Sequence, residues 1–177
     1  LGNGQDSAVD GMDGSPACFS AILCGSSLNT NYNDADSLSG NSVAYSNALG
    51  GVSFKVTRGM ENTDATTGND PVMSYAASTS IMGATVKAGV SQIDYKAAGT
   101  ADVDPSFVTV GYSLAGLSLG YAMYDGDNGG EETQMGVGTS MMGMDVGVTF
   151  ATADLATDVD YTRISVGKGM GAASFGV

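Results

Sequence analysis

The chain alternates between large apolar residues and small or polar residues over much of its length. In "YSLAGLSLGYAMY", residues 112–124, a large apolar side chain stands at every second position, the alternation slips once at Ala115-Gly116, and it then resumes. A period of two is the signature of a β-strand, and glycine reaches turn dihedrals without steric cost. The stretch therefore predicts two strands joined by a tight turn.

The same hairpin pattern recurs along the chain. It returns in "SNALGGVSFKV", "STSIMGATVKA", "TSMMGMDVGV" and "VGKGMGAASFGV". We predict about ten strands of roughly nine to eleven residues within residues 41–177, a length that crosses a bilayer when the strand is tilted. The turn glycines of the five predicted hairpins are Gly51, Gly83, Gly116, Gly143 and Gly171.

The connections between the predicted strands differ at the two ends of the sheet. Tight glycine turns lie at one end, and long polar segments such as "GMENTDATTGNDP" and "DYKAAGTADVDP" lie at the other. Short turns on one side and long loops on the other are typical of an outer-membrane barrel.

The face opposite the apolar residues consists mainly of glycine, serine, threonine and alanine. A solvent-facing sheet would carry more lysine and glutamate, which keep edges from pairing. Lys55, Lys87 and Arg163 fall on this small-residue face. A wet lumen tolerates such charges, whereas Lys or Arg at the lipid midplane costs about 2–4 kcal/mol. The pattern predicts an all-β protein, a transmembrane antiparallel up-and-down β-barrel, with these three residues lining its pore.

Tyrosines are expected at the membrane interfaces, where amphipathic rings are favoured. Those that fall within or near the ends of predicted strands are Tyr45, Tyr75, Tyr112, Tyr121, Tyr124 and Tyr161.

Charge and hydropathy exclude two classes of protein. The chain has 19 acidic and only six basic residues, a net charge of -13, whereas nucleic-acid binding needs clustered lysine and arginine. No apolar run approaches the roughly 18 residues that a transmembrane helix requires. The opening "LGNGQDSAVD" has no basic start or apolar signal core, so we expect it to begin at a mature terminus or inside a longer chain.

The two cysteines, Cys18 and Cys24, lie close together in a polar stretch. In an exported protein this spacing suggests a local disulfide, and the alternative is a pair of reduced thiols. A tetrahedral metal site is not expected, because the chain has no histidine and no further cysteine.

Catalytic chemistry finds little support. "GLSLG" at residues 116–120 has the spelling of a nucleophile elbow, but there is no histidine base and the serine falls within a predicted strand. Asp125 and Asp127 are spaced as in a calcium loop, yet Gly136 stands where a bidentate glutamate belongs. We expect no enzymatic activity and no cofactor, and keep these two aspartates only as a weak calcium candidate.

The repeats "GYSLAGLSLGYAMYDGD" and "GVGTSMMGMDVGVTFATAD" resemble those of the Gram-negative general porins, in particular the alphaproteobacterial ones, over residues 41–177. The resemblance implies a sixteen-stranded barrel in the outer membrane, surrounded by lipid and usually a homotrimer. Such a barrel is a water-filled channel for passive diffusion of ions and small hydrophilic solutes. Its third extracellular loop folds into the lumen as a constriction. Because about ten strands cannot form such a barrel, we expect the chain to be part of a longer porin.

Residues 1–40 are predicted to be a long polar loop. The loop precedes a strand that runs to a short turn, so it occupies the place of the inward-folded constriction loop, and the alternative is an ordinary surface loop. The acidic candidates for the constriction are Asp10, Asp13, Asp34 and Asp36.

A second class of protein also fits an acidic, glycine-rich chain without histidine. This is a secreted or surface-layer β-rich protein with a structural or adhesive role and no channel activity. Dependence on detergent would separate the two, because only the porin needs it to stay in solution.

Overall fold

The fold is a single antiparallel β-sheet. The computed structural model describes residues 2–9, 12–15, 17, 37–59, 72–94, 101–127, 130–142, 144–154, 159–170 and 173–176, with the backbone alone described for 2–6, 37–41, 159–170 and 173–176. The strands are β1 (Gly2–Asp6), β2 (Ser37–Leu49), β3 (Val52–Gly59), β4 (Met73–Ile81), β5 (Ala84–Gln92), β6 (Ser106–Leu114), β7 (Leu117–Asp125), β8 (Glu131–Met141), β9 (Met144–Asp154), β10 (Val159–Met170) and β11 (Ala173–Gly176).

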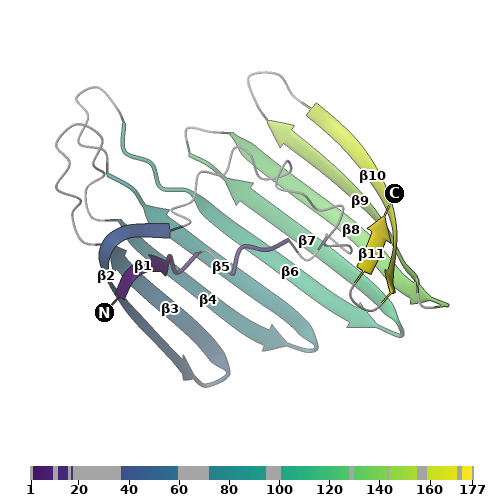
Figure 1. The fold of residues 1–177 in the computed structure, drawn as a ribbon, viewed down its shortest axis with the longest axis horizontal. Helices are drawn as coiled ribbons and strands as arrows, with labels where there is room; N and C mark the ends of the chain where they lie inside the picture. The colour runs from purple at the N-terminus through teal and green to yellow at the C-terminus, as the bar shows by residue number, and fades with distance from the viewer. Residues whose placement is uncertain are drawn as a thin grey trace.

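Every strand pairs with the strands that precede and follow it in the sequence. The sheet order is β1 to β11 without a crossover, and all neighbouring strands are antiparallel. Figure 1 shows the tight turns from β2 to β3, from β4 to β5 and from β6 to β7 together at one end of the sheet. At the other end, longer stretches of sequence separate the strands. The predicted all-β, antiparallel up-and-down architecture is confirmed. Within the described ranges there is no helix with the length and apolar character to cross a membrane.

The tight turns contain two residues with positive φ. Ala115 and Gly116 have φ of 51° and 81°, and Met82 and Gly83 have φ of 53° and 83°. Two consecutive positive values are typical of a type I′ turn, whose twist matches that of the flanking strands. Gly143 and Gly171 lie outside the described residues, but the strands that flank each of them pair as predicted, β8 with β9 and β10 with β11.

One face of the sheet is apolar and exposed. Tyr112 pairs with Leu119, and Leu119 pairs in turn with Val137, so apolar side chains form continuous rows across β6, β7 and β8. Leu119 is 43% exposed and Phe150 is 52% exposed. The other large apolar residues exposed on strands are Val43, Tyr45, Leu49, Val52, Tyr75, Ile81, Val108, Leu114, Leu117, Met123, Met135, Val137 and Met141. We call this the apolar face.

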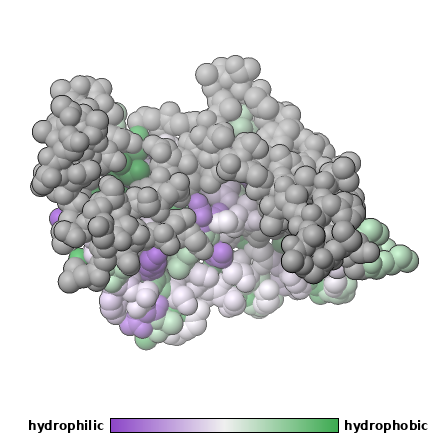
Figure 2. Space-filling view, in the orientation of Figure 1, coloured by the Kyte–Doolittle hydropathy of each residue, from purple (hydrophilic) through white to green (hydrophobic). Residues whose placement is uncertain are grey.

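The opposite face carries small and polar residues, and many of them are buried. We call it the polar face. In Figure 2 the described atoms on the side toward the viewer are white and purple over much of the middle of the molecule. Its buried members include Ser42, Thr57, Ser74, Ala76, Ser91, Thr109, Ala122, Gln134, Thr149, Ala151 and Ala153. The faces therefore separate as the alternation predicts.

The first 40 residues differ from the predicted loop at both ends. Residues 2–6 form β1, and β2 begins at Ser37 rather than after residue 40. Strand β1 has the sequence GNGQD, which has no apolar alternation, so its conformation comes from backbone pairing with the first part of β2. A local sequence pattern does not show such a strand, since the partner supplies its hydrogen bonds.

Candidate functional site

The chain that leaves β1 crosses the polar face of the sheet. We call its described residues, 7–9, 12–15 and 17, the cross-sheet segment. Figure 1 shows this segment in front of the central strands, and Ala8, Val9 and Ala17 are fully buried. A backbone segment can lie on this face because small side chains leave room and hydroxyl groups supply hydrogen-bond partners.

The beginning of the segment is bonded to β3. The backbone N–H of Ala8 donates to Thr57 Oγ1 over 2.8 Å, and Lys55 Nζ donates to the carbonyl of Ser7 over 2.8 Å. Thr57 and Lys55 are two positions apart on β3, so they project from the same face. The two bonds provide partners for the carbonyl of Ser7 and the N–H of Ala8, which belong to buried residues.

The middle of the segment turns and packs on two aromatic rings. The N–H groups of Met12 and Asp13 both donate to the carbonyl of Val9, over 2.9 and 3.2 Å. Val9 packs in one buried cluster with Phe107 of β6 and Tyr124 of β7, and Met12 lies against it. This cluster is the apolar contact between the segment and the sheet.

Two further hydrogen bonds continue across the sheet. The Tyr124 hydroxyl donates to the carbonyl of Asp13 over 2.6 Å, and Thr149 Oγ1 on β9 donates to the carbonyl of Ala17 over 2.7 Å. The segment is therefore bonded to β3, β7 and β9 in chain order.

The ring of Phe107 lies over a glycine of the neighbouring strand. Gly89 of β5 pairs with Phe107, and a Cβ built on Gly89 would come within 2.5 Å of Phe107 Cε1 and 2.9 Å of the carbonyl oxygen of Tyr75. Real Cβ atoms do not approach other atoms so closely, so residue 89 must be glycine for the ring to lie where it does.

Charged groups are divided across the polar face. Lys55 and Lys87 lie on β3 and β5, whereas Glu132 and Asp145 lie on β8 and β9. Glu132 is buried and accepts a hydrogen bond from Gln134 Nε2 over 2.8 Å, and Asp145 accepts one from Ser140. Among these four side chains the bases lie on β3 and β5 and the acids on β8 and β9, an arrangement that produces an electric field across the face. The backbone of Arg163 on β10 is in the polar-face phase beside the acidic strands.

The predicted basic residues fall on the expected positions of the sheet. Lys55 pairs with Ser46 and Ala76, and Lys87 pairs with Ser78 and Thr109. The backbone of Arg163 pairs with Thr149.

The predicted acidic residues are only partly described. Asp13 lies in the cross-sheet segment with its side chain half-buried. Asp10, Asp34 and Asp36 lie outside the described residues, as do Cys18 and Cys24.

The weak calcium candidates take part in the β7–β8 connection. The carboxylate of Asp125 accepts the N–H of Asp127 over 2.8 Å, and the carboxylate of Asp127 accepts the N–H of Asp104 over 3.1 Å. In the described part of the chain, no three acidic, histidine or cysteine side chains come together to hold a metal.

Sequence reasoning missed the two aromatic residues of the site. Tyr124 was expected at a membrane interface, but it is 3% exposed and faces the cross-sheet segment. The signal was present in the alternation, because Phe107 and Tyr124 are each one position out of phase with the apolar residues Val108 and Met123. An aromatic residue in the small-residue phase marks a place where something packs on that face.

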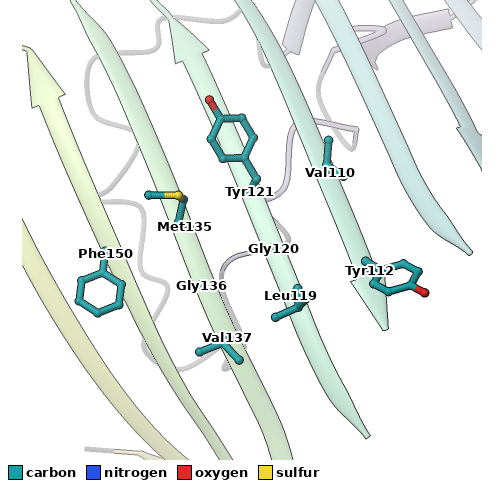
Figure 3. Close-up of a pocket in the computed structure, with 9 residues that line it drawn as sticks. All are labelled: Val110, Tyr112, Leu119, Gly120, Tyr121, Met135, Gly136, Val137 and Phe150. Carbon is teal, nitrogen blue, oxygen red and sulfur yellow. The ribbon is translucent and has the colours of Figure 1, made fainter. Parts of the chain in front are cut away.

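The apolar face has a shallow groove over β6 to β9. Figure 3 shows the side chains that line it, with Tyr121 and Leu119 of β7 between Val110 of β6 and Met135 of β8. Gly120 and Gly136 form its floor, and its volume is about 460 Å³. No charged residue lines it.

Comparison with known proteins identifies the fold. No protein-family model and no curated protein sequence matches the chain. Among solved structures, the chain is similar to the porin OmpF of Salmonella typhi in complex with daunomycin, with a TM-score of 0.60 and 14% sequence identity. The match covers 77% of this chain and 52% of the porin chain, so this chain spans about half the length of that protein. The up-and-down sheet with one apolar and one polar face is a porin-like fold.

Proposed function

We propose that this chain is part of an outer-membrane porin, a water-filled channel for passive diffusion of ions and small hydrophilic solutes. The observation that carries the proposal is the single sheet with an exposed apolar face and a polar face crossed by a segment of its own chain. A soluble protein would cover such an apolar face with a second layer. Lipid hydrocarbon can cover this face instead, because a sheet that closes into a barrel leaves no backbone N–H or C=O group unpaired in the lipid.

The cross-sheet segment is proposed to narrow the channel. It lies against the polar face, which would line the lumen, and it is bonded to three strands there. Asp13 belongs to the described part of this constriction, and Lys55 and Lys87 belong to the wall beside it. Passage would then depend on the size of a solute and on its response to a field between basic and acidic walls.

The remaining parts of the proposal come from the resemblance to porins. They are location in the outer membrane of a Gram-negative bacterium, relation to the alphaproteobacterial type, assembly as a homotrimer, a barrel completed by further strands, and absence of catalysis. The likeness to OmpF supports a porin-like fold. The alphaproteobacterial relation rests on the sequence repeats alone, and the absence of catalysis on the lack of a histidine base.

Conductance in a planar lipid bilayer tests the function. The full-length protein, purified in detergent, is expected to insert and give stepwise increases in current. It should also leave bacterial membranes only with detergent and migrate as an oligomer that heat dissociates. A protein that stays soluble without detergent and gives no current would instead be a secreted or surface-layer structural protein.

A further inference from the structure

We propose that Phe107 and Tyr124 form an aromatic anchor that positions the cross-sheet segment and thereby sets the width of the channel. This inference rests on the proposed porin function. It concerns two residues whose role the alternation of the strands does not explain, because the other residues that β6 and β7 place on the polar face are small or polar.

The surroundings of the two rings show why they hold the segment. In the rows on either side of the anchor, strands β5 to β7 present Ser91 on one side and Lys87, Thr109 and Ala122 on the other. On this part of the polar face the large apolar surface is that of Phe107 and Tyr124, which are 2% and 3% exposed. Val9 is fully buried and packs in one cluster with both rings and Ala122. An apolar contact inside a wet lumen is favoured because it removes apolar area from water.

The aromatic anchor also fixes where the cross-sheet segment lies along the sheet. The hydroxyl of Tyr124 donates to the carbonyl of Asp13, and the N–H of Asp13 donates in turn to the carbonyl of Val9, the residue that packs on the rings. The ring of Phe107 is held in turn by Gly89, where a larger residue would push it away from the sheet. Packing determines the height of the segment above the sheet, and the hydrogen bond determines its lateral position.

The position of the anchor along the strands is consistent with this role. Phe107 and Tyr124 pair with each other across β6 and β7, with Gly89 on one side and Glu132 on the other. The segment crosses at this row on its way from Thr57 on β3 to Thr149 on β9. Hydrogen bonds hold its two ends, and the aromatic anchor holds the part between them.

The test combines protease cleavage with single-channel recording on the full-length protein. In detergent, an endoprotease that cuts before aspartate reports on exposure of Asp13. Phe107→Ala is expected to raise the cleavage rate on the order of 100-fold, as for a large buried side chain cut to alanine. Tyr124→Phe keeps the ring and loses one hydrogen bond, so its expected increase is about fivefold to tenfold.

In a bilayer the same variants are expected to change the pore. Phe107→Ala should give a larger and more variable single-channel conductance than the unmodified protein, and Phe107→Leu should restore a narrow distribution because it refills much of the space. Phe150→Ala is the matched control, since it removes an exposed ring from the apolar face. It should leave both cleavage and conductance unchanged.

The outcomes separate the anchor from the porin function. If the unmodified protein conducts, and both Phe107→Ala and Tyr124→Phe show unchanged cleavage and conductance, the anchor is wrong and the porin function stands. If the unmodified protein does not conduct, the porin function and the control of channel width both fail. The cleavage rates then still decide whether the two rings hold the segment. If Phe107→Ala does not fold, the cleavage rate and the conductance of Phe107→Leu and Tyr124→Phe decide whether the two rings position the segment.

Discussion

Thr149 and Ala17 are joined by a hydrogen bond of 2.7 Å although 132 positions separate them in the sequence. Both residues are buried, Thr149 at 4% exposure and Ala17 at 0%. The bond joins the end of the cross-sheet segment to β9, whereas the Thr57 bond joins its beginning to β3 on the same face of the sheet.

Replacing Thr149 with valine tests the strength of this tie. Valine keeps the shape of the side chain and removes the donor, which leaves the carbonyl of Ala17 buried without its partner. We expect a loss of about 1–3 kcal/mol in the free energy of unfolding, measured by denaturant titration in detergent micelles. Thr152→Val on the exposed side of the same strand is the control and should change stability by less than about 0.5 kcal/mol. Equal effects of the two variants would argue against the tie.

The charge of Lys87 should influence ion preference. Lys87 lies on the polar face between Ser78 and Thr109, so Lys87→Glu changes the charge of the proposed lumen wall by two units. We expect the reversal potential in a salt gradient to shift toward cation preference. The shift should diminish at high salt, because screening shortens the range of the charge. Arg58→Glu makes the same change in charge at an exposed residue that pairs with Val43 and Met73 on the apolar face. It is expected to shift the potential less, and an equal shift would place Lys87 outside the conduction path.

In the proposed lipid environment, a charge on the apolar face should destabilise the protein according to its depth in the bilayer. Met135 lies within β8 and Met141 at its end beside the tight turn, and they are 55% and 59% exposed. Met135→Lys should cost about 2–4 kcal/mol and Met141→Lys about 0–1 kcal/mol, since the cost falls toward the interface. Urea unfolding from lipid vesicles measures both. If the face met water rather than lipid, neither lysine would be costly.

The tight turn at Ala115-Gly116 depends on the backbone freedom of its glycine. Gly116 has a φ of 81°, and a Cβ added there would meet no atom within 4 Å. Gly116→Ala should therefore cost about 1–2 kcal/mol through the left-handed conformation alone. Gly14→Ala is the matched control, because it has the same open space without the positive φ. It should be neutral or stabilising by up to about 1 kcal/mol. A thermal scan of the detergent-solubilised protein gives the difference.

The fold could be predicted from the sequence because its signals are local. Each hairpin carries its own alternation and its own turn, and residues such as Leu117 and Leu119 show their face by their phase. The interior of the site depends on contacts between distant residues. Nothing near Thr57 or Thr149 in the sequence indicates that Ala8 and Ala17 bind them. The strand β1 was missed for a similar reason, because its conformation comes from pairing with β2.

The length of the cross-sheet segment constrains the shape of the sheet. Thr57 and Thr149 lie six strands apart and, following the register through Ser74 and Ser80 of β4, six residues apart along the strands. On a flat sheet this is roughly 35 Å. The chain from Ala8 to Ala17, shortened by the turn at Val9, reaches at most about 32 Å even when its two terminal hydrogen bonds are added in a straight line. The two ends can be bound together only if the sheet bends toward the segment. The segment therefore acts as a chord that limits the radius of the arc, and deleting a residue from it would require a tighter arc or the loss of one bond.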